Sequence, residues 1–240
     1  LLTLESVVKM EKAFGLPAMG EHYAKIASAV KVAIRKKYWD VSRGLFADTY
    51  KHNSFSQHVN SLAVLAGVIT GDEARQVMHS VLTGIDLIQV TIYFRYYLNQ
   101  ALNKAGLGDE LLEHLGVWKE QMALGLTTWA ERPEPSRSDC HAWGASPNIE
   151  FYRVVLGIDS DAPGFGKVRI APNLGTLKKV SGTVPHPLGD IAVNYEVDKK
   201  GKLIATVDLP ENIKGTFVWK GQNYPLVSGH QAFTINQQAS

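Results

Sequence analysis

The stretch Gly157-Ile-Asp-Ser-Asp-Ala-Pro-Gly-Phe-Gly-Lys-Val-Arg-Ile-Ala171 separates two kinds of sequence in this chain. Before it, apolar residues recur at the three- and four-residue spacing of helices; after it, they alternate as in strands. Helices followed by strands, without interleaving, predict two domains rather than one α/β sheet. We place the boundary between residues 160 and 161, with a helical domain over 1–160 and a β-sandwich over 161–240.

The residues before this stretch predict about seven helices joined by short turns that contain Gly or Asp. Short turns favour antiparallel helix pairs, and pairs that curl into a toroid fit the pattern better than a straight bundle. Helical spacing has already begun at Leu4, so we expect the chain to begin inside a larger domain. Asp72 and Asp109 are expected to cap two of the helices. The predicted helices cover residues 4–14, 20–38, 54–69, 72–84, 91–105, 109–125 and 147–156.

The residues after the stretch predict about seven short strands within roughly 80 residues, the profile of a small antiparallel β-sandwich. Turn residues separate the strands, and Lys199-Lys-Gly201 is expected to form a hairpin loop. The predicted strands cover residues 167–171, 177–185, 191–198, 203–209, 215–219, 222–227 and 230–235.

Composition excludes several classes of protein. The 240 residues are 45% apolar and 20% charged, as in an ordinary globular protein. A net charge of +2 gives no reason to expect nucleic acid or an anionic membrane as a partner. The longest apolar stretch, 62–69, is too short to span a bilayer. Cys140 is the one cysteine, so no internal disulfide can form. A single cysteine does not indicate the cellular compartment of the protein.

The segment Thr127-Thr-Trp-Ala-Glu-Arg-Pro-Glu-Pro-Ser-Arg-Ser-Asp-Cys-His-Ala-Trp143 is the candidate functional loop. Aromatic faces beside carboxylates are typical of sites that hold and cleave sugars, and large polar side chains in a loop favour a site over a core. Glu131 is the first candidate for a general base or acid, with the two tryptophans able to tune its pKa. The alternative is a surface glutamate paired with Arg132 or Arg137.

The other residues of this loop leave more than one interpretation open. His141 either hydrogen-bonds a substrate hydroxyl or packs near a helix start. Asp139 either caps the loop or contacts ligand, while Trp129 and Trp143 are candidate walls of the site. Cys140 has no identifiable orienting residue, so a thiol nucleophile is not expected. The histidines lack metal-ligand spacing and no Gly-rich phosphate loop occurs, so no metal or nucleotide cofactor is predicted.

Aromatic and polar residues elsewhere are read mainly as structural. Tyr93 belongs to a tyrosine cluster at helical spacing, which is typical of a core, although one tyrosine could reach the mouth of a toroid. Phe55, His58 and Asn60 begin a predicted helix and are weaker candidates for lining the site. Glu134, between two prolines, is expected at the surface.

Several motifs resemble glycoside hydrolase family 78, the inverting α-L-rhamnosidases. The end of the catalytic domain of that family is similar to Thr127-Thr-Trp-Ala-Glu131, Ser138-Asp-Cys-His-Ala-Trp143 and Ser146-Pro147. Its C-terminal β-domain is similar to residues 155–158, 163–168, 170–175, 182–185 and 189–191. The resemblance covers most of the chain and implies an (α/α)6 toroid followed by a β-sandwich. It also implies a rhamnose-containing glycoside or polysaccharide as substrate.

The resemblance assigns roles within the loop. Glu131 matches the general base of the T-T-x-x-E motif, and His141 matches the sugar-contacting histidine of the H-A-W motif. The acidic, tryptophan-containing motif of the general acid is absent from these residues. The resemblance therefore implies a C-terminal fragment with half of the site, whose partner is the missing N-terminal half of the catalytic domain. We expect the fragment to be almost inactive alone, and a periplasmic or extracellular location fits the family.

Two other functions remain open from the sequence. One is a different carbohydrate enzyme with a helical toroid, such as a lyase that abstracts a proton with Tyr or His. The other is a glycan-binding module without activity, in which Trp219 and Tyr224 form a stacking platform on the strands. Packing of these two rings inside the sandwich is the alternative to such a platform.

Overall fold

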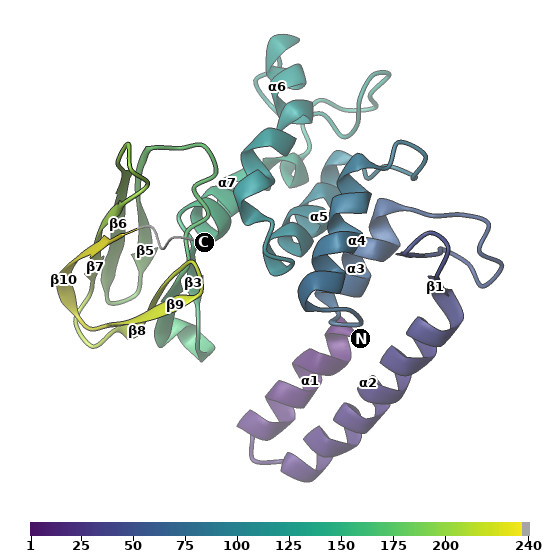
Figure 1. Cartoon of the computed structure of the whole chain (residues 1–240), viewed down its shortest axis with the longest axis horizontal. Helices are drawn as coiled ribbons and strands as arrows, with labels where there is room; N and C mark the ends of the chain where they lie inside the picture. The colour runs from purple at the N-terminus through teal and green to yellow at the C-terminus, as the bar shows by residue number, and fades with distance from the viewer. Residues whose placement is uncertain (237–240) are drawn as a thin grey trace. The chain divides into compact units, whose positions relative to one another are not determined.

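The computed structural model describes residues 1–236 and divides into two compact units. The first unit contains Leu1–Leu107 and Ala130–Trp143, and the second contains Gly108–Trp129 and Gly144–Ser240. The expected fold class, helices together with largely antiparallel sheets, is confirmed (Figure 1). The second unit contains residues on both sides of the domain boundary predicted between residues 160 and 161. That boundary stays a prediction.

The first unit consists of helices and one short hairpin. The helices α1 and α2 run antiparallel as a helical hairpin, and α3, α4 and α5 follow (Figure 1). The hairpin of β1 and β2 was not predicted because each of its strands has two residues, too few to show alternation. The elements are α1 Leu2–Ala13, α2 Pro17–Tyr38, β1 Trp39–Asp40, β2 Leu45–Phe46, α3 Gln57–Leu65, α4 Gly71–Thr83 and α5 Ile92–Lys104.

A side-chain cap marks the start of α3, whereas α4 and α5 begin without one. The hydroxyl of Ser56 accepts a hydrogen bond from the backbone N–H of Val59 at 3.3 Å, so α3 begins with a capped first turn. Thr91 occupies the N-cap position of α5. The prediction that Asp72 caps α4 is wrong, because Thr70 occupies that position. The carboxylate of Asp72 lies in the first turn instead, where it interacts favourably with the helix dipole.

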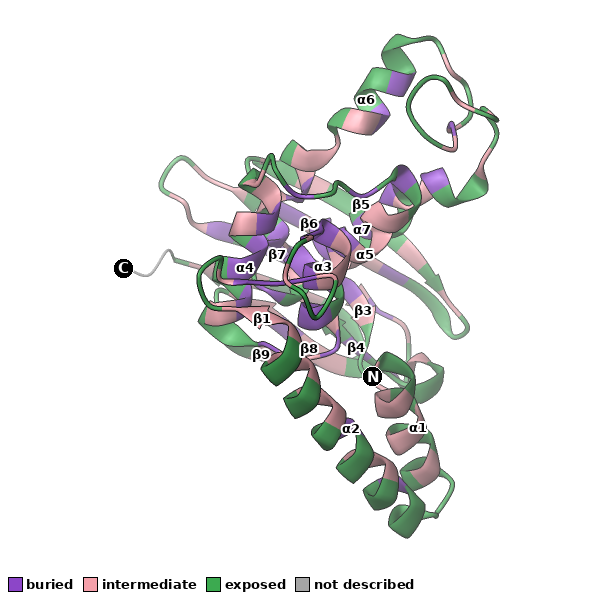
Figure 2. Cartoon of the chain, turned by 90° about the vertical axis from the view of Figure 1, so that its right-hand side faces the viewer, coloured by how far each residue is buried: buried purple, intermediate pink, exposed green. Residues whose placement is uncertain are grey.

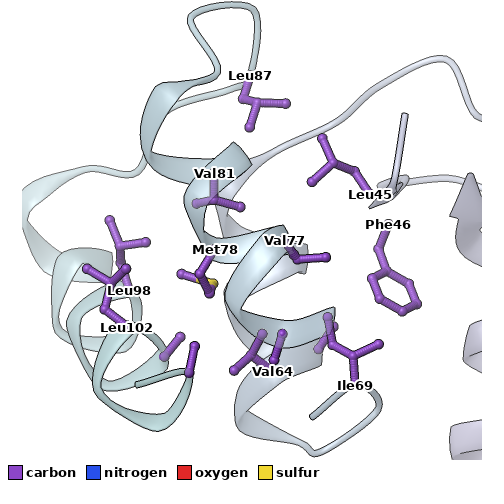
Figure 3. Packing of buried hydrophobic residues seen from close by; sticks show 14 of the residues in the cluster. Leu45, Phe46, Val64, Ile69, Val77, Met78, Val81, Leu87, Leu98 and Leu102 are labelled. Atoms are coloured by element: carbon purple, nitrogen blue, oxygen red, sulfur yellow. The ribbon is translucent and has the colours of Figure 1, made fainter. Parts of the chain in front are cut away.

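The core of the first unit lies between α3, α4 and α5. Figure 3 shows Val64, Met78 and Leu102 projecting toward one another from the three helices. Met78 and Leu102 are fully buried. By contrast, α1 has no buried residue and α2 has two, so their surfaces are exposed or intermediate along most of their length (Figure 2). The three-helix core therefore fixes the start of α5, which carries site residues.

The helical part of the second unit is less regular than predicted. The single helix expected over 109–125 is a 3-10 helix followed by α6, and the helix expected over 147–156 changes from α to π after one turn. Asp109 does not cap a helix; its carboxylate accepts a hydrogen bond from the backbone N–H of Gly175 at 2.8 Å. The elements are η1 Gly108–His114, α6 Gly116–Ala123, η2 Ala142–Ala145, which spans the unit boundary, α7 Pro147–Glu150 and η3 Phe151–Val155.

Two four-stranded sheets complete the second unit. One has the order β10-β7-β6-β5 and is antiparallel throughout; the other has the order β3-β4-β8-β9. All seven predicted strands are present, β3 is additional, and the pair β4–β8 is parallel rather than antiparallel. The strands are β3 Ile158–Ser160, β4 Lys167–Ile170, β5 Lys179–His186, β6 Gly189–Val197, β7 Leu203–Leu209, β8 Lys214–Trp219, β9 Gln222–Leu226 and β10 Gly229–Ile235.

Alternating side chains of the two sheets form the core of the sandwich. In β6, Ile191, Val193 and Tyr195 are buried while the residues between them are not. The Tyr195 hydroxyl donates a hydrogen bond to the carbonyl of Leu156 at 2.9 Å, and burial raises the pKa of Tyr195 well above its usual value. Trp219 and Tyr224 are partly buried and pack against this core.

Candidate active site

The candidate loop forms one wall of a pocket in the first unit, which we call the Glu131 pocket. Its volume is about 300 Å³, at the lower end of the range for small-ligand sites. Glu131 is the one carboxylate among its lining residues within the described chain. The lining residues are Thr91, Tyr93, Glu131, Arg132, Arg137 and Trp143.

Short-range hydrogen bonds hold the loop closed and place Glu131 at its base. The backbone N–H of Glu131 donates to the carbonyl of Ser138 at 2.9 Å. Inside this closure, the hydroxyl of Ser136 donates to the same carbonyl at 2.9 Å. The carboxylate of Glu134 accepts the backbone N–H of Ser136 at 3.1 Å. Glu134 therefore supports the loop, and it does not line the pocket.

Arg137 binds both carboxylate oxygens of Glu131. Its Nε donates to Oε2 at 2.8 Å, and its Nη2 donates to Oε1. The Glu131 side chain is 14% exposed and the Arg137 side chain 72% exposed, so the carboxylate is sheltered while the guanidinium faces solvent. A bidentate fork of this kind is the geometry that arginine and carboxylate favour. The pairing with Arg137, which the sequence left open, is the arrangement in the structure.

These contacts keep Glu131 ionised at neutral pH. The hydrogen bonds from Arg137 lower the pKa of Glu131 below its usual value, burial opposes this effect, and the charges of Arg137, His141 and Arg132 add to the lowering. An ionised carboxylate can accept a proton, as a general base must. Arg137 uses one lone pair on each oxygen, so the remaining lone pairs of Glu131 can still accept a proton from a water molecule.

Aromatic rings form the other wall of the pocket. The rings of Tyr93 and Trp143 meet edge to face, with their centroids 5.3 Å apart, and the His141 ring lies 4.5 Å from Trp143 on the same measure. The buried Nδ1 of His141 has no hydrogen-bond partner among the described residues. An unpartnered buried ring nitrogen can bind a ligand hydroxyl, as donor or acceptor according to tautomer.

The structure brings together some of the expected site residues and separates others. Glu131 and Trp143 line the same pocket, and His141 contacts Trp143. Trp129 belongs to the second unit, and Asp139 is exposed and does not line the pocket.

The sequence did not predict all residues that line the pocket, and some residues that it proposed as weaker candidates do not line it. Thr91 was not recognised as a site residue, although a polar N-cap beside an aromatic residue in the first turn was the available signal. Tyr93, read mainly as core, lines the pocket and is 48% exposed. Phe55 and Asn60 are buried in the first unit and do not line the pocket.

Neither a metal site nor a membrane span is found in the part of the chain that the structure describes. No three His, Cys, Asp or Glu side chains within residues 1–236 gather in a way that could hold a metal ion. Within the same residues, no helix combines the length and apolarity that a membrane crossing needs.

Comparisons with known proteins agree with the resemblance in the sequence. Residues 157–233 match the family described as bacterial alpha-L-rhamnosidase C-terminal domain. An alpha-L-rhamnosidase of Alteromonas sp. (strain LOR) is 38% identical over 138 residues, which are 50% of this chain and 15% of that protein.

Solved structures share the fold over most of the chain. A family 78 rhamnosidase of Bacillus sp. GL1 has a TM-score of 0.80 and 24% identity, over 90% of this chain and 25% of that one. An alpha-L-rhamnosidase of Streptomyces avermitilis, complexed with L-rhamnose, has a TM-score of 0.78 and 15% identity, over 98% of this chain and 26% of that one. The resemblance to family 78 is thereby confirmed, and the chain corresponds to a partial C-terminal region of such proteins, about a quarter of their length or less.

Proposed function

We propose that this partial C-terminal region of a family 78 protein carries the general-base half of an inverting α-L-rhamnosidase site. The observation that carries the proposal is the sheltered, ionised carboxylate of Glu131 in a pocket with an aromatic wall. Support comes from relatives named as alpha-L-rhamnosidases, one of them holding L-rhamnose. The proposed substrate is a terminal α-L-rhamnosyl residue of a glycoside or polysaccharide.

In the proposed reaction, Glu131 removes a proton from a water molecule that attacks the anomeric carbon of the rhamnosyl unit. A carboxylic acid on the opposite side of the sugar protonates the leaving oxygen, and the anomeric configuration inverts. Such carboxyl pairs are separated by about 6.5–9.5 Å, which leaves room for the water. The Glu131 pocket contains one carboxylate among its described lining residues. The acid must therefore come from another part of the enzyme.

The neighbours of Glu131 take supporting roles in this proposal. We assign to His141, whose Nδ1 has no partner among the described residues and whose ring contacts Trp143, a hydrogen bond to a sugar hydroxyl. Trp143 and Tyr93 offer ring surface to the apolar face of the sugar. Arg137 orients Glu131 through both oxygens and leaves lone pairs that can accept the proton of the water.

Two measurements on the isolated chain test this division of the site. We expect no appreciable hydrolysis of an aryl α-L-rhamnoside, because the acid is missing. We also expect L-rhamnose to shift the amide NMR signals of Thr91, Tyr93 and residues 131–143, while D-mannose, its differently shaped control, shifts them less. Appreciable turnover would contradict the missing acid. Equal shifts with both sugars, or none, would contradict a rhamnose pocket.

A further inference from the structure

The second unit contains a larger pocket, independent of Glu131, which we call the lysine pocket. Its volume is about 970 Å³, at the upper end of the range for small-ligand sites. Four lysines and one tryptophan stand out among its lining residues: Lys178, Lys199, Lys200, Lys220 and Trp219. All four lysines are exposed, and none forms an ion pair with another described residue.

Asp198, which also lines the pocket, is used to shape the loop that carries two of the lysines. Its carboxylate accepts the backbone N–H of Lys200 at 2.8 Å and that of Lys202 at 2.9 Å. These bonds lower the pKa of Asp198 below its usual value. The β6–β7 loop is therefore built around Asp198, and both Lys199 and Lys200 line the pocket.

The other two carboxylates of the pocket are engaged elsewhere as well. Asp109 accepts the backbone N–H of Gly175, another lining residue, at 2.8 Å. Glu196 lies 3.9 Å from the ammonium of Lys179, which is outside the pocket. Among the lining residues, lysines outnumber carboxylates by four to three, and Lys179 just outside the pocket pairs with Glu196, so positive charge is in excess here. Clustered charges of one sign in a concave surface attract a ligand of the opposite sign.

Trp219 and Lys220 add a second, structural signal. The Trp219 ring packs partly against the sandwich core, and the Lys220 ammonium lies 5.8 Å from its centroid. Lys220 and Gly221 form the β8–β9 turn with φ angles of +47° and +79°. Turns with two positive φ angles favour Asn-Gly, and lysine at the first position carries a backbone cost. A lysine with a positive φ angle beside an indole in a pocket motivates the hypothesis of a binding role.

We infer that the lysine pocket binds an anionic saccharide. The exposed part of the indole lies against the C–H face of a sugar ring, and the lysines bind its carboxylate or sulfate groups. Single-stranded nucleic acids are held by several stacked aromatic rings along a groove, whereas this pocket offers one indole. The inference does not depend on the role proposed for Glu131, because all lining residues of the lysine pocket belong to the second unit.

Isothermal titration of the whole chain with four probes tests the chemistry of the ligand. We expect hexagalacturonate or sulfated maltohexaose to bind. Tighter binding of hexagalacturonate would identify the recognised anionic group as a carboxylate, and tighter binding of sulfated maltohexaose would identify it as a sulfate. Neutral maltohexaose and inorganic polyphosphate are expected to bind at least about tenfold more weakly. If maltohexaose binds equally well, charge is not what the pocket recognises. If polyphosphate binds equally well, the saccharide is not recognised. Either result overturns the inference.

Variants locate the binding. Replacing Lys199 and Lys200 together by Gln is expected to weaken saccharide binding about tenfold. The matched control replaces Lys167 and Lys214, both exposed on strands outside the pocket, by Gln. An equal loss in the control would show nonspecific attraction and overturn the site.

A further variant, Lys220→Asn, separates binding from stability. It suits the turn and is expected to raise the melting temperature while weakening saccharide binding. Unchanged saccharide binding in this variant would contradict a ligand role for Lys220 and, with it, the inference.

Discussion

Asn60 offers a sharp test of how the first unit is held together. Its side-chain oxygen accepts the backbone N–H of Phe46 at 2.8 Å, and its amide donates to the carbonyls of Phe46 and Ser56 at 3.0 and 2.9 Å. Asn60 and Phe46 are both fully buried. In Asn60→Ala the N–H and C=O of Phe46 lose these partners where water cannot replace them. Two unsatisfied buried groups at about 1–3 kcal/mol each predict a loss of about 2–6 kcal/mol.

Native-state amide hydrogen exchange is the suitable assay, because two units need not unfold together and a global midpoint can mix them. The most protected amides of α3, α4 and α5 are expected to exchange at least about thirtyfold faster in Asn60→Ala. Those of β6 and β7, in the second unit, are the internal reference. The control is Asn53→Ala, at an exposed residue that accepts one hydrogen bond from Thr49. If Asn60→Ala changes exchange no more than this control, the reasoning is refuted.

Three further predictions address strain, charge and the candidate base. Gly157 has a φ of +73°, and an added Cβ would lie 2.1 Å from a backbone carbonyl carbon, so Gly157→Ala should destabilise the second unit by at least about 2 kcal/mol in urea unfolding; a smaller loss would contradict this close approach. The hydrogen bond that His52 donates to Asp40 raises the pKa of His52, and hydrogen bonds from Ser42 and then His52 lower the pKa of Asp40 to about 2. The stabilisation from His52 is therefore complete below its unfolded pKa and lost as pH rises through its folded pKa. Asp40→Asn should lower the pKa of His52 in an NMR titration, and no change would refute the pairing. Arg137→Met should raise the pKa of Glu131 and move the acid limb of the pH–rate profile of a full-length enzyme to higher pH; an unmoved limb would show that Glu131 is not the titrating base.

The periodicity of apolar residues predicted most elements because short-range patterns determine them. It failed where distant contacts decide. The helix expected over 109–125 is a 3-10 helix as far as His114 and an α-helix only from Gly116, and the side chain of Asp109 binds the distant Gly175 instead of capping it. The parallel pairing of β4 and β8 was not predictable, since strand alternation is the same for both directions of pairing.

In the candidate site too, short-range sequence predicted some features, while others depend on how the chain folds. The composition of the 127–143 loop was enough to single out Glu131, but not to choose its partner, because either Arg132 or Arg137 was close enough in sequence. The hydrogen bond from Glu131 to Ser138 closes the loop and brings Arg137 to the carboxylate. Trp129, two residues from Glu131, belongs to the other unit, so closeness in sequence did not predict a shared pocket.

The most direct test of the central claim is the kinetics of Glu131→Gln in a full-length enzyme that contains this sequence. Glutamine keeps the shape of the side chain but cannot accept the proton of the attacking water. General-base catalysis contributes about 10²–10⁴-fold, so we predict that kcat falls at least about a hundredfold while L-rhamnose binding stays within about twofold. Glu134→Gln, in the same loop but outside the pocket, should retain normal turnover. Normal turnover in Glu131→Gln would contradict the account.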